Sequence, residues 1–197
     1  MGQFEYVMVL ISIIIGLGIT HLLLGLSGIV DRLASGGKPL RLSLAYFAWL
    51  ATTFVWLLLF WWWEFRSPKF IEQWTVGLYF FFAAYAITLF LMAALLVPRS
   101  WDSVQDLGSH FLARKSWFYP LLFLANAIDI VDTFLKDGWF STQPVMNYTV
   151  WIALAVMPVI GLRSNALRVH SVLGVVAVTL QVTSAFSVLP MLGSLIH

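Results

Sequence analysis

The chain has 197 residues, of which 61% are hydrophobic and only 10% are charged. A soluble domain carries roughly a quarter charged residues, so this composition excludes a water-covered globular domain and indicates a single membrane domain over residues 1–197. The net charge of +2 comes from scattered Lys and Arg residues, which argues against nucleic-acid binding, and the absence of cysteine excludes disulfides and thiolate metal sites.

Six apolar stretches are long enough to cross a bilayer as helices, which requires about 20 residues. In chain order they cover residues 4–30, 42–63, 74–97, 117–135, 145–162 and 169–196. Between the third and fourth stretches, residues 100–115 carry apolar side chains at helical spacing, and Ser100 is a candidate N-cap. The sequence therefore predicts an all-α polytopic membrane helical bundle of six transmembrane helices, plus a short amphipathic interfacial helix.

The distribution of Lys and Arg predicts the orientation of this bundle. The loops after the first, third and fifth stretches hold eight basic residues, whereas the other side holds three, Arg66, Lys69 and Lys136. The positive-inside rule then puts both termini on the non-cytoplasmic side. The first residues lack the features of a cleavable signal peptide, so we expect the first stretch to remain in a protein of the bacterial inner membrane.

The first predicted helix carries a histidine on a face rich in glycine. Gly18, His21, Gly25 and Gly28 follow one another at steps of three and four residues. Small residues allow helix backbones to approach closely, so this face should pack against protein rather than lipid. His21 is then a neutral histidine bonded to one neighbour, a proton-transfer group or a ligand contact.

The fourth predicted helix carries most of the acidic groups near the middle of the membrane. Asn126 and Asp129 lie on one stripe, and Asp132 forms an i,i+4 pair with Lys136 toward the outer surface. Asp129 has no partner within its own helix, so it requires a donor from another helix, a bound cation or a proton. An ionisable residue inside a membrane is by default a candidate functional site.

The sixth predicted helix places Gln181 near its middle, where a buried amide commonly bonds one helix to another. The remaining histidines, His110, His170 and His197, are expected at the surfaces, which argues against bis-histidine haem ligation. Gly25 to Gly28 resembles the Gly-x-Ser-Gly signature of rhomboid proteases, but the Ala-His pair expected on a later helix is missing.

These features favour a small channel or transporter for protons or a small cation rather than an enzyme. The expected ion-binding set is Asp129, Asn126, His21, Gln181 and Asp132, in a homo-oligomer surrounded by lipid and without metal or other cofactor. Two alternatives remain open at this level. One is a membrane scaffold or accessory subunit whose polar residues only join helices, and the other is an intramembrane enzyme or haem protein.

Overall fold

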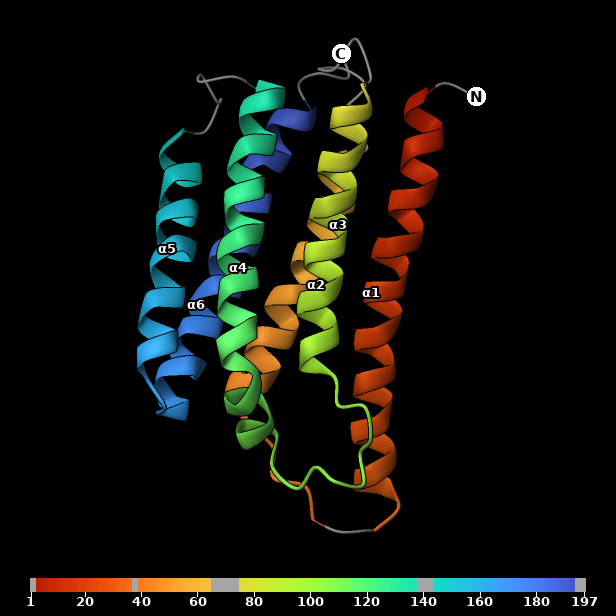
Figure 1. Ribbon diagram of the computed structural model, residues 1–197. Helices are drawn as coiled ribbons and strands as arrows, with labels where there is room; N and C mark the ends of the chain where they lie inside the picture. Colours follow the sequence, from red (N-terminus) through yellow and green to blue (C-terminus); the bar gives the residue numbers. More distant parts are fainter. Residues whose placement is uncertain (1–2, 37–38, 65–74, 138–143, 194–197) are drawn as a thin grey trace.

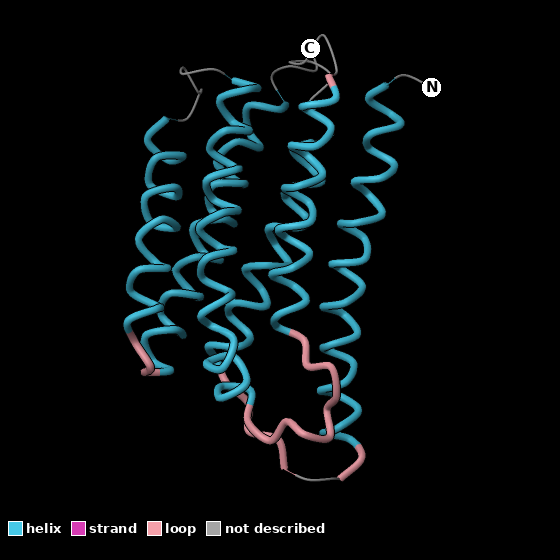
Figure 2. Tube along the Cα trace, viewed as in Figure 1, coloured by secondary structure: helices cyan, strands magenta, loops and turns pink. Residues whose placement is uncertain are grey.

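A computed structural model describes residues 3–36, 39–64, 75–137 and 144–193. The described residues form six α-helices joined by short connections (Figure 2). The helices are α1 (Gln3–Ala34), α2 (Leu44–Glu64), α3 (Val76–Leu96), α4 (Leu107–Asp137), α5 (Pro144–Arg163) and α6 (Leu167–Gly193). Within these ranges there is no strand, apart from one isolated bridge between Arg41 and Asp106.

This architecture confirms the all-α fold predicted from the sequence. Helices α1, α2, α3, α4 and α6 are long and apolar enough to cross a membrane, while Asn147–Arg163 of α5 forms a shorter apolar helical segment. The six predicted stretches each correspond to one helix, with ends that differ by a few residues except in α4. Helix α4 begins ten residues earlier than predicted, at Leu107 rather than at residue 117.

The separate interfacial helix over residues 100–115 is wrong. Residues 98–106 form turns and an extended segment, and residues 107–115 are the first turns of the long helix α4. The cap is Asp106 rather than Ser100, because the Asp106 carboxylate accepts from the backbone N–H of Gly108 at 2.9 Å and from the Ser109 hydroxyl at 2.7 Å. The Ser109 hydroxyl is the main cause that lowers the pKa of Asp106 below its ordinary value.

The α3–α4 loop is held to other parts of the same end of the bundle. Arg41 donates its backbone N–H to the Gln105 carbonyl at 2.8 Å, and its own carbonyl accepts from Leu107 N–H at 3.0 Å. The Trp101 indole fills the space beside Gly28, where an added Cβ would lie 2.1 Å from Nε1. The loop is thereby attached both to the α1–α2 connection and to α1 itself.

The six helices run roughly alongside one another (Figure 1). Helices α1, α3, α4 and α5 form one row, with α1 and α5 at its two edges, and α2 and α6 lie behind it. The most extensive packing joins α2 to α6 and α1 to α3. We call the end of the bundle where α1 begins the upper end, and the end with the α3–α4 loop the lower end.

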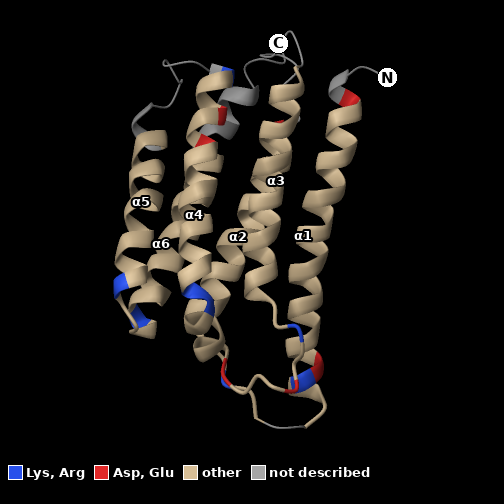
Figure 3. Ribbon diagram, viewed as in Figure 1, with Lys and Arg blue, Asp and Glu red and all other residues tan. Residues whose placement is uncertain are grey.

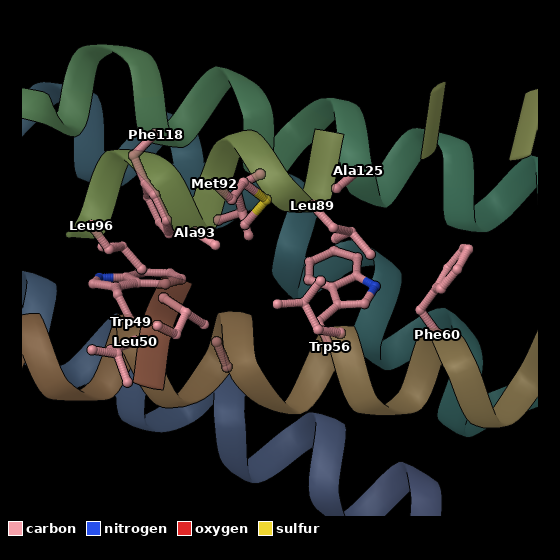
Figure 4. Packing of buried hydrophobic residues seen from close by; sticks show 14 of the residues in the cluster. Trp49, Leu50, Trp56, Phe60, Leu89, Met92, Ala93, Leu96, Phe118 and Ala125 are labelled. Carbon is pink, nitrogen blue, oxygen red and sulfur yellow. The ribbon is translucent and has the colours of Figure 1, made fainter. Parts of the chain in front are cut away.

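The interior is filled by large aromatic and aliphatic side chains, among them Trp49, Trp56, Leu89 and Phe118 (Figure 4). The outside of the bundle is also apolar. Side chains that are more than half exposed occur on several helices, including Ile13, Leu24, Phe80, Ile152 and Val172. A helical bundle that is apolar outside as well as inside suits hydrocarbon surroundings rather than water.

Most of the charged residues in the described ranges lie toward the two ends of the bundle, and most of the Lys and Arg residues among them lie at the lower end (Figure 3). The glycine face of α1 packs inward as predicted. A Cβ added to Gly18 would lie 3.3 Å from Leu57 on α2, and one added to Gly25 would lie 2.7 Å from Val97. The absent side chains therefore permit the close approach of α1 to its neighbours.

Candidate buried polar site

The carboxylate of Asp129 lies between helices α3, α4 and α5. Its Oδ1 accepts a hydrogen bond from the Tyr85 hydroxyl on α3 at 2.8 Å, and its Oδ2 accepts from the Trp151 indole N–H on α5 at 3.1 Å. Both donors are electrically neutral. The sequence predicted that Asp129 requires a donor from another helix, a bound cation or a proton, and the structure shows two donors from other helices.

This arrangement extends to α2 through Tyr85, which is nearly fully buried. The Trp56 indole N–H donates to the Tyr85 hydroxyl at 2.9 Å, and the Tyr85 hydroxyl in turn donates to Asp129. We call Trp56, Tyr85, Asp129 and Trp151 the Asp129 site. The site joins four helices through three hydrogen bonds, and its polarised chain places partial positive charge next to one carboxylate.

About two helical turns beyond Asp129 on α4, nearer the upper end, Lys136 contacts two carboxylates. Its Nζ donates to Glu64 Oε1 on α2 at 2.5 Å and to Asp132 Oδ2 at 2.6 Å. The Asp132–Lys136 pair expected from the sequence is therefore present, but it is buried and includes Glu64. We call Glu64, Asp132 and Lys136 the Lys136 cluster.

Two amides of the expected ion-binding set are buried, and each has an oxygen without a partner. Asn126 donates its side-chain N–H to the Trp151 carbonyl at 3.1 Å, while its Oδ1 accepts no hydrogen bond from the described residues. Gln181 Oε1 on α6 is also buried without a donor among them. Asn126 shares Trp151 with Asp129, whereas no described contact joins Gln181 to the Asp129 site.

His21 lies apart from the acidic groups. Its ring packs against Phe90 on α3, with ring centroids 6.5 Å apart. Phe90 is five residues beyond Tyr85, which corresponds to about 7.5 Å along the helix toward the lower end. The structure therefore brings together Asp129, Asn126 and Asp132 on α4, but not His21.

Two of the histidines expected at the membrane surfaces, His110 and His170, lie near the lower end of the bundle, but their side chains are buried. His110 bonds through Nε2 to the Leu96 carbonyl at 2.9 Å, and His170 contacts the Tyr119 hydroxyl through Nδ1 at 2.6 Å. Position near a helix end predicts depth along the bundle, but it does not predict whether the residue faces inward. His197 lies outside the described residues.

Four members of these sites were not predicted from the sequence: Glu64, Tyr85, Trp56 and Trp151. The positions of the helix ends could have indicated Glu64, because Glu64 ends α2 at the same upper end where Lys136 lies one residue before the end of α4. No sequence pattern marks the aromatic donors, Trp56, Tyr85 and Trp151, as partners of a buried carboxylate. Their role depends on how each helix is rotated about its axis.

Among the residues that the structure describes, no group of three or more His, Cys, Asp or Glu side chains is arranged to hold a metal ion. No protein-family model, curated protein or solved structure matches this chain. The class defined by fold and site is therefore a six-helix bundle with an apolar outer surface and buried, hydrogen-bonded carboxylates.

Proposed function

We propose that this chain is an integral membrane protein that moves protons or a small cation, with Asp129 as the binding group. The observation that carries the proposal is the carboxylate of Asp129, whose two oxygens are held by neutral donors from α3 and α5. Ionised carboxylates are costly in apolar surroundings. A bound proton or cation reduces this cost, so the site has a physical reason to bind one.

Neighbouring oxygens add to the capacity of the site. Asn126 Oδ1 and Asp132 Oδ1 are buried without a donor among the described residues, and they lie three residues before and after Asp129 on α4. Steps of three residues correspond to about 4.5 Å along a helix, so the three groups form a row of acceptors. Such a row suits a cation or proton that moves along α4.

The membrane setting of the proposal is supported by the apolar outer surface and by the position of charge. Most of the described Lys and Arg residues lie at the lower end, which we assign to the cytoplasm under the positive-inside rule (Figure 3). Both termini then face the non-cytoplasmic side of a bacterial inner membrane. We also propose a homo-oligomer, which chemical cross-linking in native membranes can test.

The direct test is flux through liposomes that contain the purified protein. We expect wild-type protein to dissipate an imposed proton or monovalent-cation gradient, and Asp129→Asn to lose at least about 90% of that flux, a tenfold decrease that equals 1.4 kcal/mol. Asp102→Asn is the matched control, because Asp102 is an exposed acid in the α3–α4 loop. Unchanged flux in Asp129→Asn would remove Asp129 from the mechanism.

A second candidate is a membrane scaffold, and one observation favours it. The hydrogen bonds of the Asp129 site join α2, α3, α4 and α5, so their purpose under this alternative is to fix the helices. Under this alternative, Asp129→Asn lowers the melting temperature in detergent, while neither wild-type nor variant protein conducts ions. Measurement of flux and melting on the same preparations separates the two functions.

A further inference from the structure

The ammonium group of Lys136 lies in a cage of acidic and aromatic groups. Its Nζ donates to Glu64 and Asp132, at 2.5 and 2.6 Å, and lies 5.4 Å from the centre of the Phe82 ring. Carboxylates accept charge-assisted hydrogen bonds, and the face of an aromatic ring attracts a cation. These groups come from α2, α4 and α3, and together they provide what a small ammonium ion requires.

The cage has an acceptor that Lys136 does not use. Asp132 is 6% exposed, and its Oδ1 has no hydrogen-bond partner in the described structure. A buried acceptor without a donor is unfavourable by itself. An occupant that presents its N–H groups differently from a tethered lysine can therefore gain a contact that Lys136 leaves unmade.

Lys136 is also well placed to leave the cage. It lies one residue before the end of α4, and its side chain has a flexible four-carbon stem. Long basic side chains near the ends of membrane helices extend readily to the interface. If another ammonium ion replaces Lys136, the two carboxylates stay compensated, so the exchange avoids the large cost of an unpaired buried charge.

We propose that Glu64, Asp132 and Phe82 form a binding site for a primary ammonium ion, and that Lys136 is its displaceable internal occupant. This inference rests on the proposed function and names the class of small cation that the protein takes. A quaternary ammonium ion has no N–H to donate to the carboxylates. A sodium or potassium ion also has no N–H group, so it cannot donate the hydrogen bonds that Lys136 donates to the two carboxylates.

The test is equilibrium binding of radiolabelled methylammonium to the purified full-length protein in detergent. Lys136→Met should bind methylammonium at least about tenfold more tightly than wild type, because Lys136 no longer competes for the cage and the competent fraction rises to one. Asp132→Asn loses the saturable binding, and Asp102→Asn matches wild type. Tetramethylammonium, sodium and potassium at equal concentration leave methylammonium binding unchanged.

Lys136→Met is checked by gel filtration, and if it does not fold, the comparison of wild type with Asp132→Asn decides the question. Absence of saturable binding in both wild type and folded Lys136→Met overturns the inference, as does equal competition by sodium or potassium. The proposed function has its own readout, the flux of Asp129→Asn. If Asp129→Asn loses flux but no protein binds methylammonium, only the ammonium site is ruled out. If methylammonium binds but the flux of Asp129→Asn is unchanged, only the role of Asp129 is ruled out.

Discussion

The hydroxyl of Tyr85 donates to Asp129 Oδ1 at 2.8 Å while it accepts from the Trp56 indole at 2.9 Å, so one phenol on α3 joins α2 to α4. Tyr85 is 2% exposed, and water is therefore not available to replace either bond. The stability of this connection is measurable with variants that remove single atoms.

Tyr85→Phe removes the hydroxyl and leaves two buried polar groups without this partner. We expect a decrease of about 1 kcal/mol in the free energy of unfolding, since hydrogen bonds within membrane bundles each contribute modestly. Chemical unfolding in detergent measures it. Tyr6→Phe is the control, because Tyr6 is 72% exposed. Equal effects of the two substitutions would contradict the role of the Tyr85 hydroxyl.

Gly161→Ala should destabilise the lower end of the bundle. An added Cβ would lie 2.2 Å from Cζ of Tyr119, whose hydroxyl is bonded to His170 and is therefore not free to move aside. Overpacking of this kind costs about 1–3 kcal/mol, measured as a lower melting temperature. The control is Gly16→Ala. An added Cβ at Gly16 would have no packing neighbour within 4 Å, so this substitution should stabilise the helix. The opposite order of the two variants would argue against this packing.

Asp106→Ala should weaken the start of α4 by about 1 kcal/mol, because the side chain that caps the helix is lost. The pKa of Asp106 is lowered from its ordinary value of 3.8, chiefly by the Ser109 hydroxyl. The stabilisation is therefore present above pH 3.8 and is lost as the pH falls through the lower pKa of the folded protein. Unfolding of wild type and variant at several pH values should give curves that converge in acid. A constant difference would contradict the ionic part of the cap.

Lys136→Met should be among the most destabilising single substitutions, because it leaves Glu64 and Asp132 without the ammonium that both contact. Loss of one partner from a buried ion pair costs about 3–5 kcal/mol. The double variant Asp132→Asn with Lys136→Met should recover part of this loss, since one of the carboxylates is removed as well. A double-mutant cycle in detergent measures the coupling. Simple additivity would show that the contact contributes little.

The sequence predicted the order of the six observed helices well, because continuous apolar runs separated by Gly and Pro leave few alternatives, but it added a seventh helix that the structure does not show. It failed at the start of α4. The apolar spacing of Trp101 to Leu112 marks a helical face, but the same pattern occurs in a surface helix and in the first turns of a long one. Whether the helix bends or continues at Lys115 depends on how it packs against its neighbours, and the spacing of apolar residues gives no information about that packing.

The candidate site was predicted only in part. Asp129, Asn126 and Asp132 share a stripe of α4 by spacing alone, so their proximity follows from the sequence. The partners of Asp129 do not, because Tyr85 and Trp151 meet it only when α3 and α5 have particular rotations about their axes. His21 was grouped with Asp129 on apparent depth, and the structure separates them because α1 packs chiefly against α3.

The attachment of the α3–α4 loop to Gly28 and to Arg41 restricts how the bundle can change shape. The loop connects α1, the segment before α2 and the beginning of α4, so we expect these parts to move less than the opposite half of the molecule, where the buried carboxylates lie. The amides of Arg41 and Leu107 are hydrogen-bonded in this connection, so their hydrogen exchange should be slow for a loop and unchanged by ammonium ions. Exchange near Glu64 and Lys136, at the upper ends of α2 and α4, should slow when an ammonium ion binds.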